Sequence, residues 1–209
     1  MLNQQITHIE IVSVHYKTPE YIYDQHSSVR KFYPQNPYRI IDGSDNGISY
    51  FGDIEELDEK FSVERFGYNI HHGPGMDHAI RSSAYEFLLI LDSDVKLTEA
   101  PLQDMMDAFT GYAVGKKLIV NANGNEAWQK KWWRKTKPCI YTYIHPYCML
   151  INKAAYLTFQ PFKKHGAPCI DTMIDIHNQQ KTQLLSAIEI EKYIDLKKRG
   201  TREKWGINL

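Results

Sequence analysis

Short apolar runs alternate with amphipathic segments through the first half of the chain. Runs rich in β-branched and aromatic residues predict strands, and apolar residues recurring every three or four positions predict helices. The predicted strands of this half cover residues 9–14, 38–41, 63–66 and 87–91. The predicted helices begin at Pro19 or cover residues 54–61 and 76–84. This alternation predicts an α/β protein with a mostly parallel sheet flanked by helices.

The first predicted helix has recognisable boundaries. Thr18 is a suitable capping residue, and Pro19 suits the first helical position, where its missing N–H costs nothing. Pro34 sets the end of the helix, because proline cannot continue it. The residues expected to face inward are Tyr21, Ile22, Val29 and Phe32.

The second half of the chain carries a weaker pattern. Pro101 is expected to open another helix, and two apolar stretches at 118–120 and 147–151 predict strands. A polar segment rich in tryptophan separates these strands. With 209 residues in total, the chain is expected to form a single domain with a full core.

The strand predicted at 87–91 ends in two carboxylates. Its five residues are all apolar without alternation, which is typical of a strand buried on both faces of a parallel sheet. Asp92 and Asp94 follow it directly, and residues two apart on an extended chain point the same way. Both carboxylates can then face one hard cation such as Mg²⁺ or Mn²⁺. The alternative is an ordinary turn, since Asp and Ser are common turn residues.

Composition narrows the range of partners. The 25 basic residues balance the 25 acidic ones, so no overall field recruits nucleic acid or an anionic membrane, although a local patch still can. No apolar run reaches the roughly 18 residues that a membrane span needs, and the first residues do not resemble a secretory signal. We therefore expect a cytoplasmic protein. The three cysteines lack metal-site spacing and are expected to be reduced thiols.

Four segments in order resemble the family 2 glycosyltransferases, which have the Rossmann-like GT-A fold. Residues 11–20 resemble the opening strand and loop of that family, and 41–47 (IDGSDNG) its turn after the second strand. Residues 69–81 resemble its glycine-containing stretch, which leads into the DSD sequence at 92–94. Two later segments, 145–151 and 166–171, resemble the acceptor-side strand and the segment carrying the catalytic carboxylate.

The resemblance implies metal-dependent transfer of a sugar from a nucleotide-diphosphate sugar to an acceptor hydroxyl. Residues 1–97 would bind the donor, and 98–209 would bind the acceptor and complete catalysis. Asp94 is the expected direct ligand of Mn²⁺ or Mg²⁺, and Asp92 would contact the metal, or the donor ribose through water. Ser93 lies between them and mainly turns the chain.

The same resemblance suggests further donor-binding residues. Asp42 would accept hydrogen bonds from the ribose or base, with a turn cap as the alternative. Ser13, His15 and Tyr16 would form the floor under the base.

The glycine-containing stretch supplies two more candidates. Gly75, with Gly73, would allow the backbone to approach the donor closely, with a plain tight turn as the rival. Arg81 could reach the diphosphate or form a solvated ion pair. His71, His72 and His78 fit no standard zinc spacing and are left out of the metal site.

The catalytic base is expected after residue 166. An inverting transferase needs one carboxylate to take the acceptor proton. Asp171 and Asp175 would share one face of a helix, and we favour Asp171. An N-cap is the alternative role for Asp171, and Ile170 stands where the family often has an acidic residue.

Two basic or polar segments bear on the acceptor. Residues 128–137 combine tryptophans with lysines and arginine, and would bind a saccharide or a nucleic acid or form an amphipathic helix. Residues 200–205 lack the Gln-x-x-Arg-Trp of processive synthases, which favours a single transfer. The acceptor class, whether saccharide, lipid-linked or nucleic acid, the sugar, the nucleotide and the oligomeric state stay open.

Two other functions compete. A phosphohydrolase of the haloacid dehalogenase type also has an apolar strand before D-x-D, matched by Asp92, Asp94 and Val95. That motif normally opens its domain, whereas here several strand and helix signals precede it. A non-catalytic nucleotide- or saccharide-binding module is the other alternative. The presence of both DSD carboxylates and of Asp171 argues against it.

Overall fold

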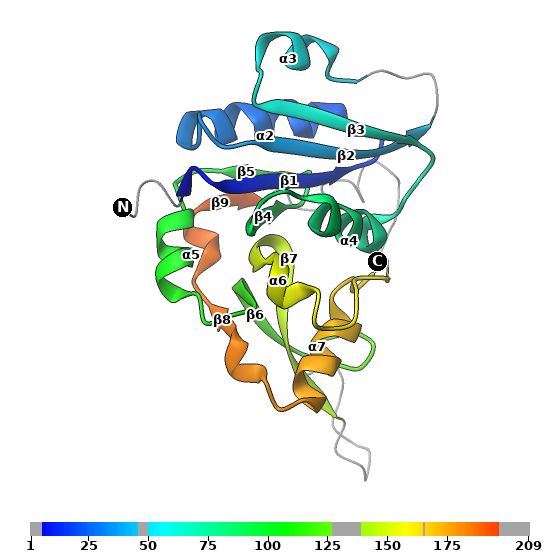
Figure 1. Cartoon of the computed structure of the whole chain (residues 1–209), viewed down its shortest axis with the longest axis vertical. Coiled ribbons are helices and arrows are strands. Elements are labelled where there is room, and N and C mark those ends of the chain that lie inside the picture. Colours follow the sequence, from blue (N-terminus) through cyan, green and yellow to red (C-terminus); the bar gives the residue numbers. More distant parts are fainter. Residues whose placement is uncertain (1–5, 46–49, 127–138, 165, 197–209) are drawn as a thin grey trace.

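The computed structural model describes residues 6–45, 50–126, 139–164 and 166–196 (Figure 1). A seven-stranded sheet with the strand order β3-β2-β1-β4-β7-β6-β8 runs through the molecule, with helices on both faces. Its strands are β1 (Ile9–His15), β2 (Tyr38–Asp45), β3 (Phe61–Gly67), β4 (Phe87–Leu91), β6 (Ala113–Asn121), β7 (Ile140–Asn152) and β8 (Leu185–Ala187). Only β7 runs against the other strands, because it pairs antiparallel with both β4 and β6. The predicted mostly parallel α/β sheet is confirmed.

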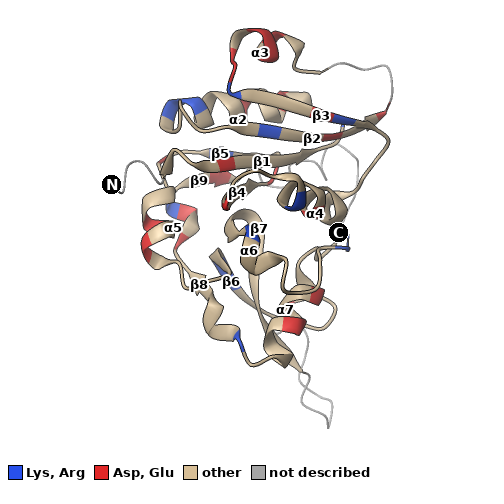
Figure 2. Cartoon of the chain, in the orientation of Figure 1, with Lys and Arg blue, Asp and Glu red and all other residues tan. Residues whose placement is uncertain are grey.

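The helices of the described part are α2 to α7, with two short 3-10 turns. Their bounds are α2 (Pro19–Phe32), α3 (Gly52–Leu57), α4 (His72–Ser82), α5 (Leu102–Ala108), α6 (Lys153–Tyr156), α7 (Ile170–Asn178), η2 (Thr182–Leu184) and η3 (Ile190–Lys192). Acidic and basic residues are distributed over several of these elements (Figure 2). None of the described helices is both long and apolar enough to cross a membrane.

Strand β4 lies between two hydrophobic cores and contributes side chains to both. Leu89 and Leu91 pack in one core together with α2, whereas Leu88 and Ile90 pack in the other together with α4. All four side chains are at most 1% exposed. The unbroken apolar run is explained by this arrangement, since a strand covered by helices on both faces has no solvent-facing position.

The first helix follows its sequence signals with one difference. Helix α2 begins at Pro19, and Ile22 and Val29 are fully buried, as expected. Thr18 occupies the N-cap position, but its side chain forms no capping hydrogen bond. Its backbone N–H instead donates to Nε2 of His15, at 2.9 Å. The start of this helix is therefore held by a hydrogen bond to His15, which the local sequence pattern does not predict.

Other boundaries differ from the prediction. Helix α3 ends at Leu57, because Phe61 already starts β3. Helix α4 begins at His72 rather than Met76, so the glycine-containing stretch forms its first turn. Strands β6 and β7 are longer than 118–120 and 147–151, because they pair with each other from Ala113 opposite Ile151 to Asn121 opposite Ile140.

A second, two-stranded sheet was not predicted. It pairs β5 (Val95–Leu97) with β9 (Ile194–Leu196) in antiparallel orientation. Strands of three residues carry too little periodicity to be recognised. This sheet connects the residues that directly follow the DSD sequence to the end of the described chain.

An ion-pair network crosses the face of the sheet beneath α4. Arg39 of β2 lies 3.0 Å from the carboxylate of Glu10 on β1 and 3.2 Å from that of Glu64 on β3. Its guanidinium also donates to the carbonyl oxygen of Ala79 in α4, at 2.8 Å. The Glu10 side chain is only 8% exposed, so its negative charge depends on this partner.

Replacing Arg39 with methionine is expected to lower the free energy of unfolding by about 3–5 kcal/mol, because Glu10 would remain buried without a compensating charge. Urea unfolding followed by circular dichroism measures the change. Lys192→Met is the control, since that exposed lysine pairs with Glu189 at the surface and should leave the unfolding midpoint unchanged. Equal midpoints for both variants would show that the Arg39 network contributes little.

Candidate functional site

The DSD sequence forms a turn at the carboxyl end of β4. The backbone N–H of Val95 donates to the carbonyl oxygen of Asp92 at 3.0 Å, and the N–H of Asp92 donates to that of Tyr147 in β7 at 2.9 Å. We name residues 92–95 the DSD turn. The segment is therefore not extended as expected, so the two carboxylates are placed by the turn and not by strand alternation.

Asp92 faces the start of helix α4. Its Oδ1 lies 3.0 Å from Nε2 of His72, and both side chains are 25% exposed. Burial acts to lower the pKa of His72, but the carboxylates of Asp92 and Asp94 outweigh it and raise the pKa above its ordinary value. The site therefore combines two carboxylates with a histidine that holds its proton more strongly than usual.

His72 is a site residue that sequence reasoning set aside. Its exclusion from the metal site stays a prediction, but tertiary packing brings it into contact with Asp92. Its position directly before Gly73 was the available signal, since the family resemblance placed that stretch at the donor.

A β-bulge in β7 brings a second histidine near the DSD turn. The register with β6 jumps from Gly115 opposite Met149 to Lys116 opposite His145. Bulges next to active sites commonly redirect a side chain. Burial lowers the pKa of His145. The carboxylate of Asp92 acts to raise this pKa and His72 acts to lower it, and the net shift is downward. The lowered pKa of His145 favours its neutral form.

His15 and Asp42 form a buried pair at the ends of β1 and β2. Nδ1 of His15 lies 2.9 Å from Oδ1 of Asp42, and these side chains are 0% and 2% exposed. Because Nε2 accepts the Thr18 N–H, Nδ1 carries the proton and donates to Asp42. Burial acts to raise the pKa of Asp42, but hydrogen bonds from His15 and Ser44 outweigh it and lower the pKa. Asp42 is therefore an ionised carboxylate held in one orientation.

The predicted floor residues lie at different depths. Ser13 is fully buried and donates to Oε1 of Gln25 at 2.6 Å. His15 packs edge-on against the rings of Tyr50 and Phe51, with centroids 5.5 and 5.1 Å away. Tyr16 is half-buried and has the ammonium of Lys17 over its ring, at 5.1 Å. Of the three predicted floor residues, Tyr16 alone has a partly exposed side chain, whereas Ser13 and His15 are fully buried.

Gly75 has a packing role. A Cβ on Gly75 would lie 2.8 Å from a methyl group of Val14 on β1. Its N–H already donates to the carbonyl oxygen of His71 at 2.9 Å. The glycine therefore allows α4 to approach the sheet closely, and this approach positions His72.

The structure does not bring Arg81 to the DSD turn. Arg81 lies at the opposite end of α4 from His72 and donates to Asp77 at 2.8 Å. Its guanidinium also stacks over the ring of Tyr156, at 5.8 Å. The ion-pair alternative describes this geometry, and Arg81 is not carried into the site.

Asp171 is connected to the start of α4 through one loop. It lies in the first turn of α7, and Nζ of Lys164 is 2.7 Å from its carboxylate. A Cβ on Gly73 would lie 2.4 Å from the carbonyl oxygen of Lys164, so that loop runs directly against α4 beside His72. Asp175 instead accepts hydrogen bonds from the N–H of Gln160 at 2.9 Å and from Gln179. Asp171 is the more available carboxylate.

The carboxylates of the DSD turn suit a metal that is shared with a substrate. Within the described ranges, no group of three or more His, Cys, Asp or Glu side chains has the arrangement of a complete metal site. Mg²⁺ is commonly held by one or two protein carboxylates together with substrate phosphates. Asp92 and Asp94 fit that partial donor set, with phosphate oxygens supplying further ligands.

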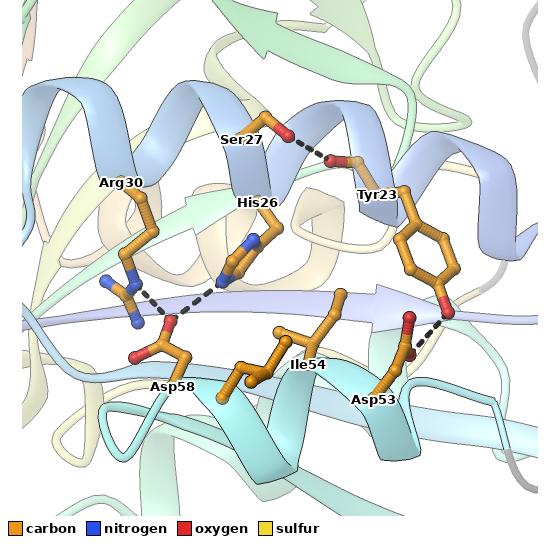
Figure 3. A pocket seen from close by; sticks show the side chains of 8 residues that line it. Tyr23, His26, Ser27, Arg30, Asp53, Ile54 and Asp58 are labelled. Carbon is orange, nitrogen blue, oxygen red and sulfur yellow. Dashed lines mark hydrogen bonds and ion pairs between the residues drawn. The ribbon is translucent and has the colours of Figure 1, made fainter.

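A groove of about 340 Å³ lies between α2 and α3, apart from the predicted site residues (Figure 3). Asp58 at its end accepts hydrogen bonds from Arg30 and, at 2.7 Å, from His26. Burial acts to raise the pKa of Asp58, but these bonds outweigh it and lower the pKa. The groove is lined by an ion-pair network that connects α2 to the segment before β3.

Two predicted segments lie outside the described residues. These are the tryptophan- and lysine-rich stretch at 128–137 and the stretch at 200–205. The last residues of the IDGSDNG turn, at 46–47, also lie outside them.

Solved structures of glycosyltransferases share this fold. TarS of S. aureus matches with a TM-score of 0.58 at 16% identity, over 89% of this chain and 36% of its own. The mannosyltransferase PcManGT of Pyrobaculum calidifontis, in complex with GDP-Man and Mn²⁺, matches with 0.59 at 16% identity, over 87% of this chain and 54% of its own. Glucosyl-3-phosphoglycerate synthase of Mycobacterium tuberculosis, in complex with Mn²⁺ and UDP-glucose, matches with 0.58 at 9% identity, over 90% and 72%.

The chain thus spans about a third of TarS and about half of PcManGT. No family model matches the sequence, and no curated protein matches it by sequence. The shared architecture, a mostly parallel seven-stranded sheet flanked by helices, is the GT-A fold.

Proposed function

We propose that this protein transfers a sugar from a nucleotide-diphosphate sugar to an acceptor hydroxyl, in a single metal-dependent step that inverts the anomeric centre. The observation that carries the proposal is the DSD turn at the end of β4, with Asp92 beside His72. The carboxyl ends of β1 and β2 lie next to this edge and contribute Asp42 and Tyr16. Ligands of open α/β sheets bind at this edge.

Each group then has a defined task. Mg²⁺ or Mn²⁺ bound at Asp94 and Asp92 would neutralise the departing diphosphate. The raised pKa of His72 favours its protonated form, which would attract an anionic group to the same edge. Asp42, ionised and oriented by His15, accepts hydrogen bonds from the ribose or base, and Tyr16 lies under the base. Asp171 takes the proton of the acceptor hydroxyl.

The two alternatives receive less support. The haloacid dehalogenase motif belongs at the first strand of its domain, whereas the DSD turn follows the fourth strand in the chain. A binding module would have no need for the available carboxylate of Asp171. Membership of family 2 and the identity of sugar and acceptor remain predictions, as does a role of residues 128–137 in acceptor binding.

Calorimetric titration of UDP, GDP and CDP, each with and without Mn²⁺, tests the proposal. We expect one nucleotide to bind only when the metal is present, because the two carboxylates would otherwise repel the diphosphate. Asp107→Asn, a charge change on the exposed face of α5, is the control and should bind as the wild type does. No binding by any of the three nucleotides would contradict the proposal.

A further inference from the structure

We propose that Gln25 of helix α2 is a positioning residue that clamps both ends of the DSD turn and thereby holds the metal-binding carboxylates in place for the donor. The inference rests on the function proposed above. It concerns a side chain that touches neither metal nor donor, and acts through the backbone of the turn.

The amide group of Gln25 is completely hydrogen-bonded. Its Nε2 donates to the carbonyl oxygen of Asp92 at 2.7 Å and to that of Val95 at 2.8 Å. Its Oε1 accepts from Oγ of Ser13 at 2.6 Å and from the hydroxyl of Tyr38 at 2.5 Å. A glutamine amide offers two donors and two acceptor positions, so all four are used.

The chemistry of the partners sets the orientation of the amide. Asp92 and Val95 present backbone carbonyl oxygens, which can only accept, so the nitrogen must face them. A flipped amide would place its oxygen against two other oxygens. Gln25 is also 0% exposed, so water does not replace any lost bond, and leaving these groups unpaired is costly.

Gln25 binds the first and last residues of the turn, Asp92 and Val95. The carbonyl oxygen of Asp92 also accepts the N–H of Val95, so its two lone pairs are both used. Three residues further along α2, Oγ of Ser28 accepts the N–H of Leu97 at 3.1 Å. Residues three apart on a helix share one face, so one face of α2 holds the whole segment from Asp92 to Leu97.

Gln25 connects the DSD turn to strands β1 and β2. Ser13 and Tyr38 anchor the oxygen end of Gln25 to β1 and β2, and the nitrogen end carries the turn. Without the nitrogen end, the segment retains the hydrogen bond inside the turn, the bond from the Asp92 N–H to Tyr147, the bond from Leu97 to Ser28 and the pairing of β5 with β9. Displacements of about 1 Å in a site are sufficient to change its activity by roughly a hundredfold.

The test compares Gln25→Met with Tyr38→Phe. The first removes all four hydrogen bonds of the amide, including both bonds to the turn, while keeping side-chain length. The second removes one of the two bonds at the oxygen end and leaves both bonds to the turn in place. We expect Gln25→Met to weaken binding of the Mn²⁺–nucleotide complex at least about tenfold relative to Tyr38→Phe, as measured by calorimetry. Amide hydrogen exchange should also accelerate at Val95 and Leu97 in Gln25→Met, and much less in Tyr38→Phe.

The outcomes separate the two proposals. Wild-type protein that binds no nucleotide contradicts the proposed function, and the exchange rates then still decide whether Gln25 holds the turn. Unchanged exchange at Val95 in Gln25→Met, or nucleotide binding as tight as that of Tyr38→Phe, overturns the positioning role. If Gln25→Met does not fold, Gln25→Asn keeps an amide one methylene shorter, which cannot span both ends, and the same differences are expected.

Discussion

Replacing Asp94 with alanine is expected to lower metal-dependent donor turnover by about a thousandfold, because a metal contributes several kcal/mol to stabilising a departing phosphate and each 1.4 kcal/mol is tenfold in rate. Asp94 lies in the DSD turn after β4 and is not part of either hydrophobic core. The variant should therefore fold as the wild type does, and the loss should appear in kinetics and in Mn²⁺-dependent nucleotide binding.

A second substitution at the same position separates charge from shape. Asp94→Asn keeps the size of the side chain but offers Mn²⁺ a neutral oxygen, so turnover should fall nearly as far. Thermal unfolding of both variants shows whether the fold is retained. Turnover that persists at the wild-type level in folded Asp94→Ala protein would remove Asp94 from the metal site.

Replacing Asp171 with asparagine is expected to lower kcat by about 10²–10⁴-fold, the usual contribution of a general base, while nucleotide binding stays unchanged. The carboxylate of Asp171 lies in the first turn of α7 and pairs with Lys164. Both groups are partly exposed, and the pair itself contributes little to stability. The separation of turnover from donor binding distinguishes a base from a residue that holds the donor.

Asp175→Asn is the matched comparison, because Asp175 lies one helical turn further along α7. Its carboxylate accepts the N–H of Gln160 and the amide of Gln179, so its loss should lower the unfolding midpoint and leave kcat close to the wild-type value. The reverse pattern, with Asp175→Asn inactive and Asp171→Asn active, would transfer the catalytic role to Asp175.

The two halves of the chain differ in how far the fold could be predicted. The strands and helices up to Leu91 follow from unbroken apolar runs and helical periodicity, and six of them were recognised close to their observed positions. The six are β1, α2, β2, β3, α4 and β4. In the second half, β8 and β9 contain three residues each, which is too few for a periodic signal.

The candidate site shows the same contrast at the level of single residues. Asp92 and Asp94 are expected at the site because they follow a predicted strand, and ligands collect at the carboxyl ends of parallel strands. Asp42 is expected there because the family resemblance implies it. His72 and Gln25 were missed. His72 reaches Asp92 because glycines let α4 approach β1 and the loop at Lys164, and Gln25 faces inward from a helix whose pattern predicts only apolar inward residues.

The sequence by itself determined the α/β class, the order of the first strands and helices, and the presence of two carboxylates after the most buried strand. These properties depend on local periodicity and on the fact that buried strands must be apolar on both faces. The tertiary structure alone decided that the carboxylates lie in a turn clamped by Gln25, that His72 and His145 flank them, and that Arg81 points elsewhere. Those contacts join residues that are far apart in the chain. Packing and hydrogen bonding in the folded protein select the residues that meet, and the local sequence around each residue does not indicate its partner.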